Sequence, residues 1–370
     1  MTLTRRTALT IGAGAALSTG FPLLPRARAA GDATFSPKPG PWRNFELTTT
    51  VEVMWPAGPT QVWVPVPGFA ADDWMRPGET TWEAPAGAAA LLGSSSGGAA
   101  LVHGQWKEGA TPSIVVTSRF STRDRAVPLE LNAAAATLSP EQRQLYTSPS
   151  SLIPVDGIVR ETADKIVAGA SSDLDKARRI YEWVVDNTSR NPTTRGCGTG
   201  DVASMLKTNN LSGKCADLNP LYVGLARAAG LPARDIYGLR VAPSAFGYKS
   251  LGANSVVVTK AQHCRAEVFI GGIGWVPVDP ADVRKVVLEE PPGKLQLSDA
   301  KVIAARKALF GAWETNWVAF NDGRDVQLPG SQGPAVPFLM YPQGETKDGR
   351  LDSLDPDTFK YTISVREIAA

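Results

Sequence analysis

One stretch constrains the fold of this chain more than any other, GKCADLNPLYVGLARAAGLPAR at residues 213–234. Its apolar side chains recur at helical spacing until a Gly-Leu-Pro sequence ends the pattern. The apolar positions are Leu218, Tyr222, Leu225 and Ala229. Pro220 lacks a backbone N–H and therefore belongs in the first helical turn. We expect a helix that begins near Ala216 or Asp217, which places Cys215 at its N-terminus.

Cys215 at this position has two interpretations. The free N–H groups and the dipole of a helix N-terminus favour negative charge, so the thiol would shift toward its reactive thiolate form. The same residue could instead be a small buried apolar side chain. The chain also has Cys197 and Cys264, and an odd number of cysteines leaves at least one thiol free in an oxidising compartment. This favours a reactive role for one of the three.

A second stretch, QHCRAEVFIGGIGWVPVDP at residues 262–280, predicts a β-hairpin. Two β-prone runs flank a glycine-rich turn, and side chains alternate between the two faces of each strand. Cys264 falls on the apolar face of the first strand, and His263 falls on the opposite face. Folding at the glycines brings His263 and Asp279 toward each other, in a register that the pattern does not fix.

The chain has two histidines, which restricts the choice of a general base. His103 lies in a β-rich region without a reactive neighbour in sequence, so we interpret it as structural. A cysteine at a helix N-terminus, with a histidine and an aspartate on neighbouring strands, can supply a nucleophile, a base and an orienting group. The candidate catalytic residues are therefore Cys215, His263 and Asp279. The imidazole takes the thiol proton, and the carboxylate holds the ring in the required tautomer.

Together, the two stretches resemble the catalytic core of the transglutaminase-like superfamily of papain-type enzymes. The shared pattern is G-x-C-x-D at the start of a helix, R-A-x-G-[IL]-P-A-R at its end, A-E-V-[FY] after the histidine, and then G-W-[VP]-x-x-D-P. The resemblance covers residues 174–282 and implies that Cys215 is the nucleophile, His263 the base and Asp279 the orienting group. The chain departs from the family at Cys264, where alanine is usual, and the strand alternation places this cysteine in the core.

The resemblance also implies an oxyanion hole, built from the backbone N–H of the nucleophile and an upstream donor. Asn209 or Asn210 could supply a side-chain amide, and both residues equally fit an ordinary turn. Members of the family differ in activity. Some crosslink glutamine to lysine, many are proteases or amidases, and some have lost catalysis.

Residues 1–29 have the features of an export signal. Arg5 and Arg6 precede a weakly apolar stretch, and ARAA offers a cleavage site after Ala29. The adjacent arginines favour the twin-arginine route. Without the four arginines of this segment the net charge changes from +2 to −2, so no basic excess indicates a nucleic-acid partner. No later apolar run has the length of a membrane span, so we expect a periplasmic or secreted protein without stable membrane insertion.

The rest of the chain predicts an α+β fold in three parts. These are a β-rich N-terminal domain at 30–140, a papain- or transglutaminase-like catalytic domain at 141–290 and a C-terminal extension at 291–370. The local patterns behind this division are strand-like runs at 46–55, 61–67, 113–120 and 359–368, helical runs at 155–170, 171–188 and 301–313, and a loop or hairpin tip at 84–100.

These observations predict an exported cysteine acyl-transfer enzyme that needs no cofactor and acts on protein or peptide amide bonds through a Cys215 thioester. Hydrolysis is favoured over crosslinking because water is the default acceptor. The alternative is a catalytically silent binding module on the same scaffold. A zinc site of three cysteines and His263 is disfavoured, because no C-x₂-C pair is present and His263 and Cys264 point to opposite strand faces. A Cys197–Cys264 disulfide would leave Cys215 free.

Overall fold

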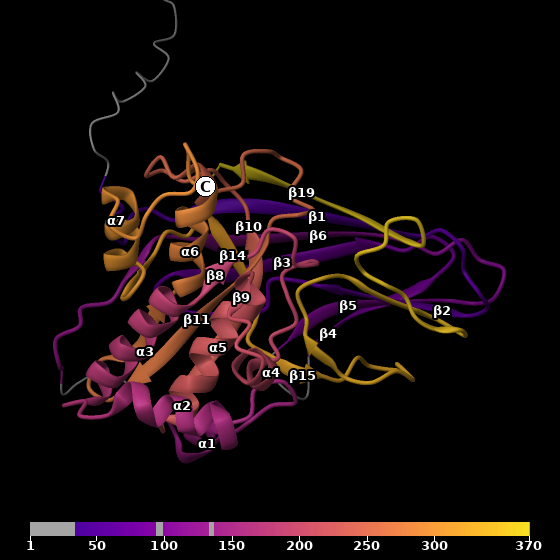
Figure 1. Ribbon diagram of the computed structural model, residues 1–370. Coiled ribbons are helices and arrows are strands. Elements are labelled where there is room, and N and C mark those ends of the chain that lie inside the picture. The colour runs from indigo at the N-terminus through magenta and orange to yellow at the C-terminus, as the bar shows by residue number, and fades with distance from the viewer. Residues whose placement is uncertain (1–33, 94–98, 133–136, 370) are drawn as a thin grey trace, which may run out of the picture. The chain divides into compact units, whose positions relative to one another are not determined.

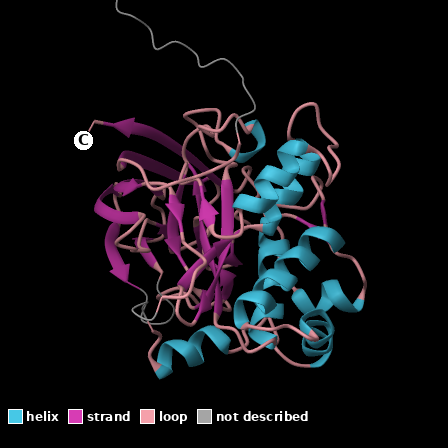
Figure 2. Ribbon diagram, turned by 90° about the vertical axis from the view of Figure 1, so that its left-hand side faces the viewer, coloured by secondary structure: helices cyan, strands magenta, loops and turns pink. Residues whose placement is uncertain are grey.

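The structure is a computed structural model that describes residues 34–93, 99–132 and 137–369 (Figure 1). The expected export signal at 1–29 lies outside the described residues. The described chain combines antiparallel sheets with helices that gather on one side of the strands (Figure 2), which confirms the expected α+β class. The helices are α1 (Pro140–Thr147), α2 (Gly157–Val167), α3 (Asp173–Asn187), α4 (Val202–Lys207), α5 (Cys215–Ala228), α6 (Pro280–Glu289) and α7 (Ala300–Ala308). Among the described residues, none of the helices has the length and apolar character needed to cross a membrane.

Two antiparallel sheets form the β-rich N-terminal region. The first has the strand order β19 (Phe359–Ile368), β1 (Arg43–Val53), β6 (Ser113–Thr122) and β3 (Met75–Glu83). The second has the order β18 (Gly349–Arg350), β17 (Gln343–Thr346), β2 (Thr60–Pro65), β5 (Ala100–Trp106) and β4 (Ala88–Gly93). Alternate residues of β1 and β6 are buried, and side chains of both sheets share one apolar cluster. The sheets therefore pack face to face as a sandwich.

The C-terminal strands belong to these same sheets. β19 pairs with β1 from Asn44↔Ile368 to Val53↔Phe359, and β17 pairs with β2. The last strand also holds the segment that leads into the central sheet, because the N–H of Val258 donates to the carbonyl oxygen of Ile363 at 2.8 Å. The region expected as a C-terminal extension thus supplies strands to the sandwich. Its last strand also binds the chain segment that precedes His263.

A third sheet packs against the helices and carries the second sequence stretch. Its strand order is β12 (Gly274–Val278), β11 (Gln262–Ile270), β10 (Ala233–Arg240) and β14 (Trp317–Asn321). Three two-stranded pairs complete the described strands: β7 (Arg125–Ala126) with β13 (Ala312–Trp313), β8 (Ser189–Arg190) with β9 (Ser212–Gly213), and β15 (Arg324–Val326) with β16 (Val336–Phe338). Every residue of α5 is buried, and α5 packs against β11 and is flanked by α2, α3 and α6. A helix buried on all sides holds its first residue in a fixed place.

Two local predictions differ from the structure. The stretch at 84–100 contains the edge strand β4, whose alanines have low strand propensity and concealed it. The helix expected at 301–313 ends at Ala308, and Gly311 with φ +117° then turns the chain into β13. That backbone conformation is accessible to glycine and ends the helix.

Candidate active site

Cys215 is the first residue of α5, one residue before the predicted helix start at Ala216 or Asp217. The Asp217 carboxylate fixes this helix end by accepting hydrogen bonds from the backbone N–H groups of Lys214, Thr199 and Gly200 at 3.0, 2.9 and 3.1 Å. A carboxylate in the first turn satisfies free N–H groups and complements the helix dipole. Asp217 therefore joins the loop before α4 to the turn that presents Cys215.

Two glycines allow the Asp217 carboxylate to lie so close to the chain. A side chain at Gly198 or Gly213 would overlap the Asp217 carboxyl group, and Gly198 also has φ +103°. Only glycine fits this conformation without strain. The glycine of the G-x-C-x-D motif is thus required by the packing of its own aspartate.

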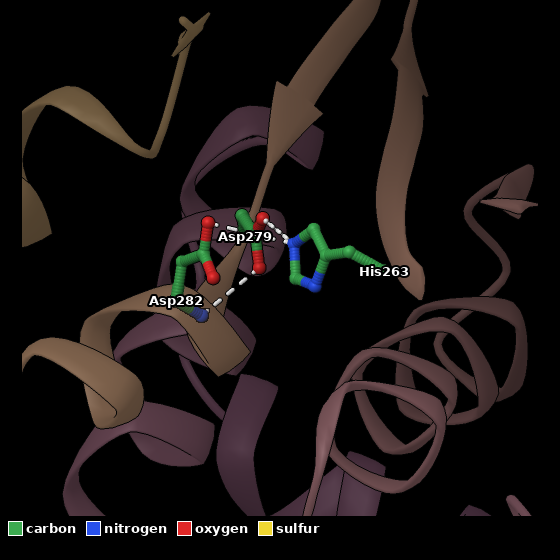
Figure 3. Close-up of side chains that lie close together, drawn as sticks. All are labelled: His263, Asp279 and Asp282. Atoms are coloured by element: carbon green, nitrogen blue, oxygen red, sulfur yellow. Dashed lines mark hydrogen bonds and ion pairs between the residues drawn. The ribbon is translucent and has the colours of Figure 1, made fainter. Parts of the chain in front are cut away.

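His263 and Asp279 lie at the ends of neighbouring antiparallel strands. β11 pairs with β12 through Ala266↔Val278, and Asp279 follows β12 directly as the N-cap of α6. The Nε2 atom of His263 lies 2.8 Å from Oδ2 of Asp279, and both side chains are buried (Figure 3). The predicted hairpin pairing is confirmed. The Nδ1 atom of His263 is then the nitrogen available to the thiol.

A second carboxylate, Asp282, also faces His263. Its Oδ2 lies 3.4 Å from Nε2 of His263, and its backbone N–H donates to Oδ1 of Asp279 at 3.0 Å. Arg240 balances this charge through an ion pair of 2.5 Å with Asp282, and Arg265 lies 3.5 Å from Asp279. The imidazole therefore sits against two buried carboxylates that two guanidinium groups neutralise.

These charges set the protonation of the pair. Burial and Arg240 lower the pKa of His263, but Asp282, Asp279 and the Asp279 hydrogen bond outweigh them and raise it to about 9. Contacts with Cys197 and Cys264 and with the charged His263 lower the pKa of the Cys215 thiol well below its usual range, against the effect of burial. Both shifts favour a thiolate at Cys215 beside an imidazolium at His263.

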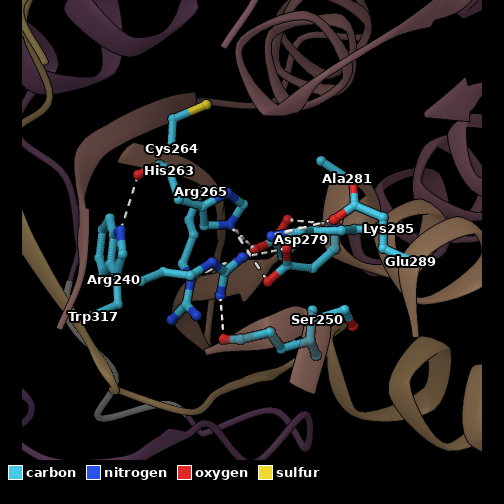
Figure 4. Close-up of polar contacts among 12 residues, drawn as sticks. Arg240, Ser250, His263, Cys264, Arg265, Asp279, Ala281, Lys285, Glu289 and Trp317 are labelled. Atoms are coloured by element: carbon cyan, nitrogen blue, oxygen red, sulfur yellow. Dashed lines mark hydrogen bonds and ion pairs between the residues drawn. The ribbon is translucent and has the colours of Figure 1, made fainter. Parts of the chain in front are cut away.

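Asn219 and Trp317 hold the base in place, and the sequence reasoning missed both. Asn219 lies one turn after Cys215 on α5, and its Nδ2 donates to the carbonyl oxygen of Cys264 at 2.7 Å and to Oδ1 of Asp279 at 3.2 Å. The indole N–H of Trp317 on β14 donates to the carbonyl oxygen of His263 at 2.9 Å (Figure 4). The i, i+4 spacing of Asn219 from the cysteine was the available signal.

The other sequence candidates lie elsewhere. Asn209 has φ +52°, Asn210 accepts a 2.7 Å hydrogen bond from the hydroxyl of Ser212, and both asparagines are exposed in the turn after α4. His103 lies in the sandwich, stacked on Trp63 and bonded to Gln61 at 2.9 Å. All three cysteines are free thiols with buried side chains, namely Cys197, Cys215 and Cys264.

The site opens into a cavity of about 290 Å³. Cys215 and His263 line it, together with Cys197, Gln262 and several basic side chains. Neither Asn209 nor Asn210 is among the described residues that line this cavity. The structure therefore brings Cys215, His263 and Asp279 together and keeps the two asparagines apart from them.

A model of the transglutaminase-like superfamily matches residues 160–280, which include α3, α5, β11 and β12. The matched part of the chain belongs to the transglutaminase-like superfamily. The resemblance inferred from the motifs is thereby confirmed. An uncharacterised protein of Haemophilus influenzae is 36% identical over 336 residues, which are 86% of this chain and 89% of that protein.

Two solved structures are also similar to this transglutaminase-like chain. A proposed cysteine protease from Cytophaga hutchinsonii has 18% identity and a TM-score of 0.49, covering 88% of this chain and 99% of its own. The periplasmic domain of TgpA from Pseudomonas aeruginosa has 16% identity and a TM-score of 0.36, covering 65% of this chain and 88% of its own. Neither similarity identifies a substrate for the chain described here.

One group of side chains in this transglutaminase-like core has the spacing of a metal site. Ligand atoms of His263, Asp279 and Asp282 lie within 4.8 Å of one another. Arg240 and Arg265 already neutralise the two carboxylates, and both guanidinium groups would repel a cation. The group is better suited to holding the imidazole proton than to binding a metal ion.

Proposed function

We propose that this chain is an exported cysteine enzyme that transfers acyl groups from protein or peptide amides through a thioester at Cys215, with water as the usual acceptor. One observation carries the proposal. Cys215, at a helix N-terminus, lines the same cavity as His263. The Nε2 atom of His263 is hydrogen-bonded to the buried carboxylate of Asp279. Nucleophile, base and orienting group thus occur in one arrangement.

In the acylation step, the Cys215 thiolate attacks the carbonyl carbon of the amide and a C–S bond forms. The imidazolium of His263 gives its proton to the amide nitrogen, the C–N bond breaks, and the amine leaves. Asp279 keeps the ring oriented throughout. The product of this step is a thioester and a neutral imidazole.

In the second step, a water molecule loses a proton to His263 and attacks the thioester carbonyl. The C–S bond breaks, the acid is released, and the thiolate–imidazolium pair returns. A primary amine could replace water and would give a new amide. Nothing in the cavity is dedicated to an amine acceptor, so we favour hydrolysis.

The oxyanion of each tetrahedral intermediate needs two donors. The backbone N–H of Cys215, as the first residue of α5, has no acceptor within the helix. Gln262 lines the same cavity next to His263 in sequence, and its side chain also interacts with the hydroxyl of Tyr361. We assign these two groups as the donors, in place of Asn209 or Asn210.

A peptide library in heavy-oxygen water tests this function. The full chain should release acids that carry the heavy oxygen, and the Cys215→Ala variant should release none. Adding a primary amine in excess separates hydrolysis from transamidation, because new amides would form only if the amine competes. Absence of turnover with every library member would favour the binding-module alternative.

Export is part of the proposal and rests on residues 1–29. Changing Arg5 and Arg6 to lysine should retain the protein in the cytoplasm if the twin-arginine route is used. Cell fractionation measures this. Normal export of the variant would reject that route, and cytoplasmic location of the unaltered protein would reject export.

A further inference from the structure

The cavity around Cys215 carries a strong excess of positive charge. Five basic side chains line it, and no Asp or Glu is among the described lining residues. The basic residues are Arg190, Lys214, Arg240, Lys260 and Lys285. A cavity lined by one sign of charge concentrates ligands of the opposite sign.

Two carboxylates outside the cavity lining form ion pairs with three of these five side chains. Arg240 forms an ion pair of 2.5 Å with Asp282. Figure 4 shows Arg240 near His263 and Asp279. Arg190 and Lys285 both form ion pairs with Glu289, and Nζ of Lys285 lies 3.8 Å from the Glu289 carboxylate. The two carboxylates therefore offset two of these three positive charges.

The other two, Lys214 and Lys260, have no acidic partner among the residues that the structure describes. Lys214 Nζ donates to the carbonyl oxygen of Thr194 at 2.7 Å, which leaves its charge in place. Lys260 is exposed and forms no ion pair with any described residue. Two uncompensated ammonium groups thus line the cavity that holds the nucleophile.

Lys214 and Lys260 lie near the place where the scissile amide of a substrate would bind. Lys214 directly precedes Cys215 in the chain. Both lysines also line a second cavity of about 380 Å³, which shares Cys197 and Gln262 with the first. The lining of this second cavity also includes Tyr341, Leu354, Phe359 and Tyr361. A group held by the lysines would therefore lie where the two cavities meet, close to Cys215.

We propose that Lys214 and Lys260 form an anion subsite, which selects acyl substrates that carry a carboxylate next to the scissile amide. This rests on the proposed function, because it gives that enzyme its substrate class. The carboxylate comes from an acidic side chain or from the C-terminus of a peptide, and both present the same chemistry to the lysines. Salt weakens such a contact because the lysines are partly or fully exposed.

The decisive experiment compares the alkylation of Cys215 by iodoacetate and by iodoacetamide, which differ in charge. Mass spectrometry of the labelled peptides gives the rate at Cys215 alone. The rate with iodoacetate divided by the rate with iodoacetamide should be higher at Cys215 than for free cysteine. Lys214→Gln and Lys260→Gln should each lower this ratio by about threefold to fivefold. High salt should have the same effect. Lys360→Gln, an exposed lysine paired with Glu52, is the matched control and should leave the ratio unchanged.

The outcomes separate the two proposals. An unchanged ratio in both lysine variants overturns the anion subsite and leaves the proposed function intact. Failure of Cys215 to react with either reagent, while Cys197 reacts, rejects the proposed function and the subsite with it. Once a cleaved peptide is known, Glu against Gln beside the scissile bond, and a free against an amidated C-terminus, identify which carboxylate the lysines bind. Equal kcat/KM in both comparisons also overturns the subsite.

Discussion

The Nε2 atom of His263 lies 2.8 Å from Oδ2 of Asp279 and is buried from solvent. This contact determines which nitrogen of the ring is available to Cys215. It also stabilises the protonated imidazole, since the pKa of His263 is raised to about 9 by Asp282 and Asp279 against burial and Arg240. Together with the lowered pKa of Cys215, this favours a thiolate–imidazolium pair.

The pH dependence of kcat/KM should form a bell. The rate rises at acid pH as Cys215 loses its proton, and it falls as pH passes about 9, because His263 can then no longer protonate the leaving amine. These apparent pKa values belong to the coupled pair. Asp282→Asn removes a charge that raises the pKa of His263, so the descending limb should move to lower pH.

The control for that shift is Asp186→Asn, which breaks an exposed ion pair with Arg306 and should leave the profile unchanged. Thermal unfolding of each variant shows whether it is folded. A descending limb that stays in place in folded Asp282→Asn would mean that this second carboxylate does not act on the imidazole.

Asp279→Asn should lower kcat by about 10²-fold to 10³-fold while KM stays nearly constant, because orientation and charge act on the reacting state. Asp279→Ala should be worse, since it also removes the N-cap of α6, where Asp279 Oδ1 accepts from the N–H of Asp282 at 3.0 Å. Steady-state kinetics measure both variants. Equal activity of the Ala and unaltered proteins would remove Asp279 from the mechanism.

Gln262→Ala should lower kcat by about 10²-fold with little change in KM, the usual effect of losing one oxyanion donor. Asn210→Ala is the comparison, because Asn210 was the sequence candidate and lies in an exposed turn. We expect the Asn210 variant to keep full activity. The reverse result, with Asn210 required and Gln262 dispensable, would contradict the assignment of the donor.

Asn219→Ala should reduce the free energy of unfolding by about 1–3 kcal/mol, because the buried carbonyl of Cys264 loses its hydrogen bond. Asn187→Ala is matched in chemistry, since Asn187 Nδ2 donates to the carbonyl oxygen of Trp183 at an exposed site. Its effect should stay below about 0.5 kcal/mol. Urea titration compares the two. Similar losses of unfolding free energy in the two variants would indicate that the buried hydrogen bonds of Asn219 stabilise the fold no more than an exposed one.

Much of this site could be predicted because its signals are local. Pro220 and the Gly-Leu-Pro end of the stretch fix α5, and hence the place of Cys215, within a few residues. The glycine turn pairs β11 with β12 and so brings His263 and Asp279 toward each other, in a register that only the structure shows. Only two histidines compete for the role of base.

The rest depends on partners that are distant in sequence. Asp282 on α6 gains its role from Arg240 on β10, and Gln262 is notable because it lines the cavity beside Cys215. The pairing of β19 with β1 joins the two ends of the described chain, and no local pattern encodes it. Asn209 and Asn210 were chosen for their nearness to Cys215 in sequence, whereas the turn directs them to solvent.

The most direct test of the account uses two buried cysteines as a matched pair, Cys215→Ala and Cys264→Ala. With a slowly hydrolysed substrate, mass spectrometry of the unaltered protein should place the acyl adduct on Cys215. Cys215→Ala should lose nearly all turnover, while Cys264→Ala should keep most of it and lose about 1–2 kcal/mol of stability. An adduct on Cys197, or full activity in Cys215→Ala, would contradict the mechanism.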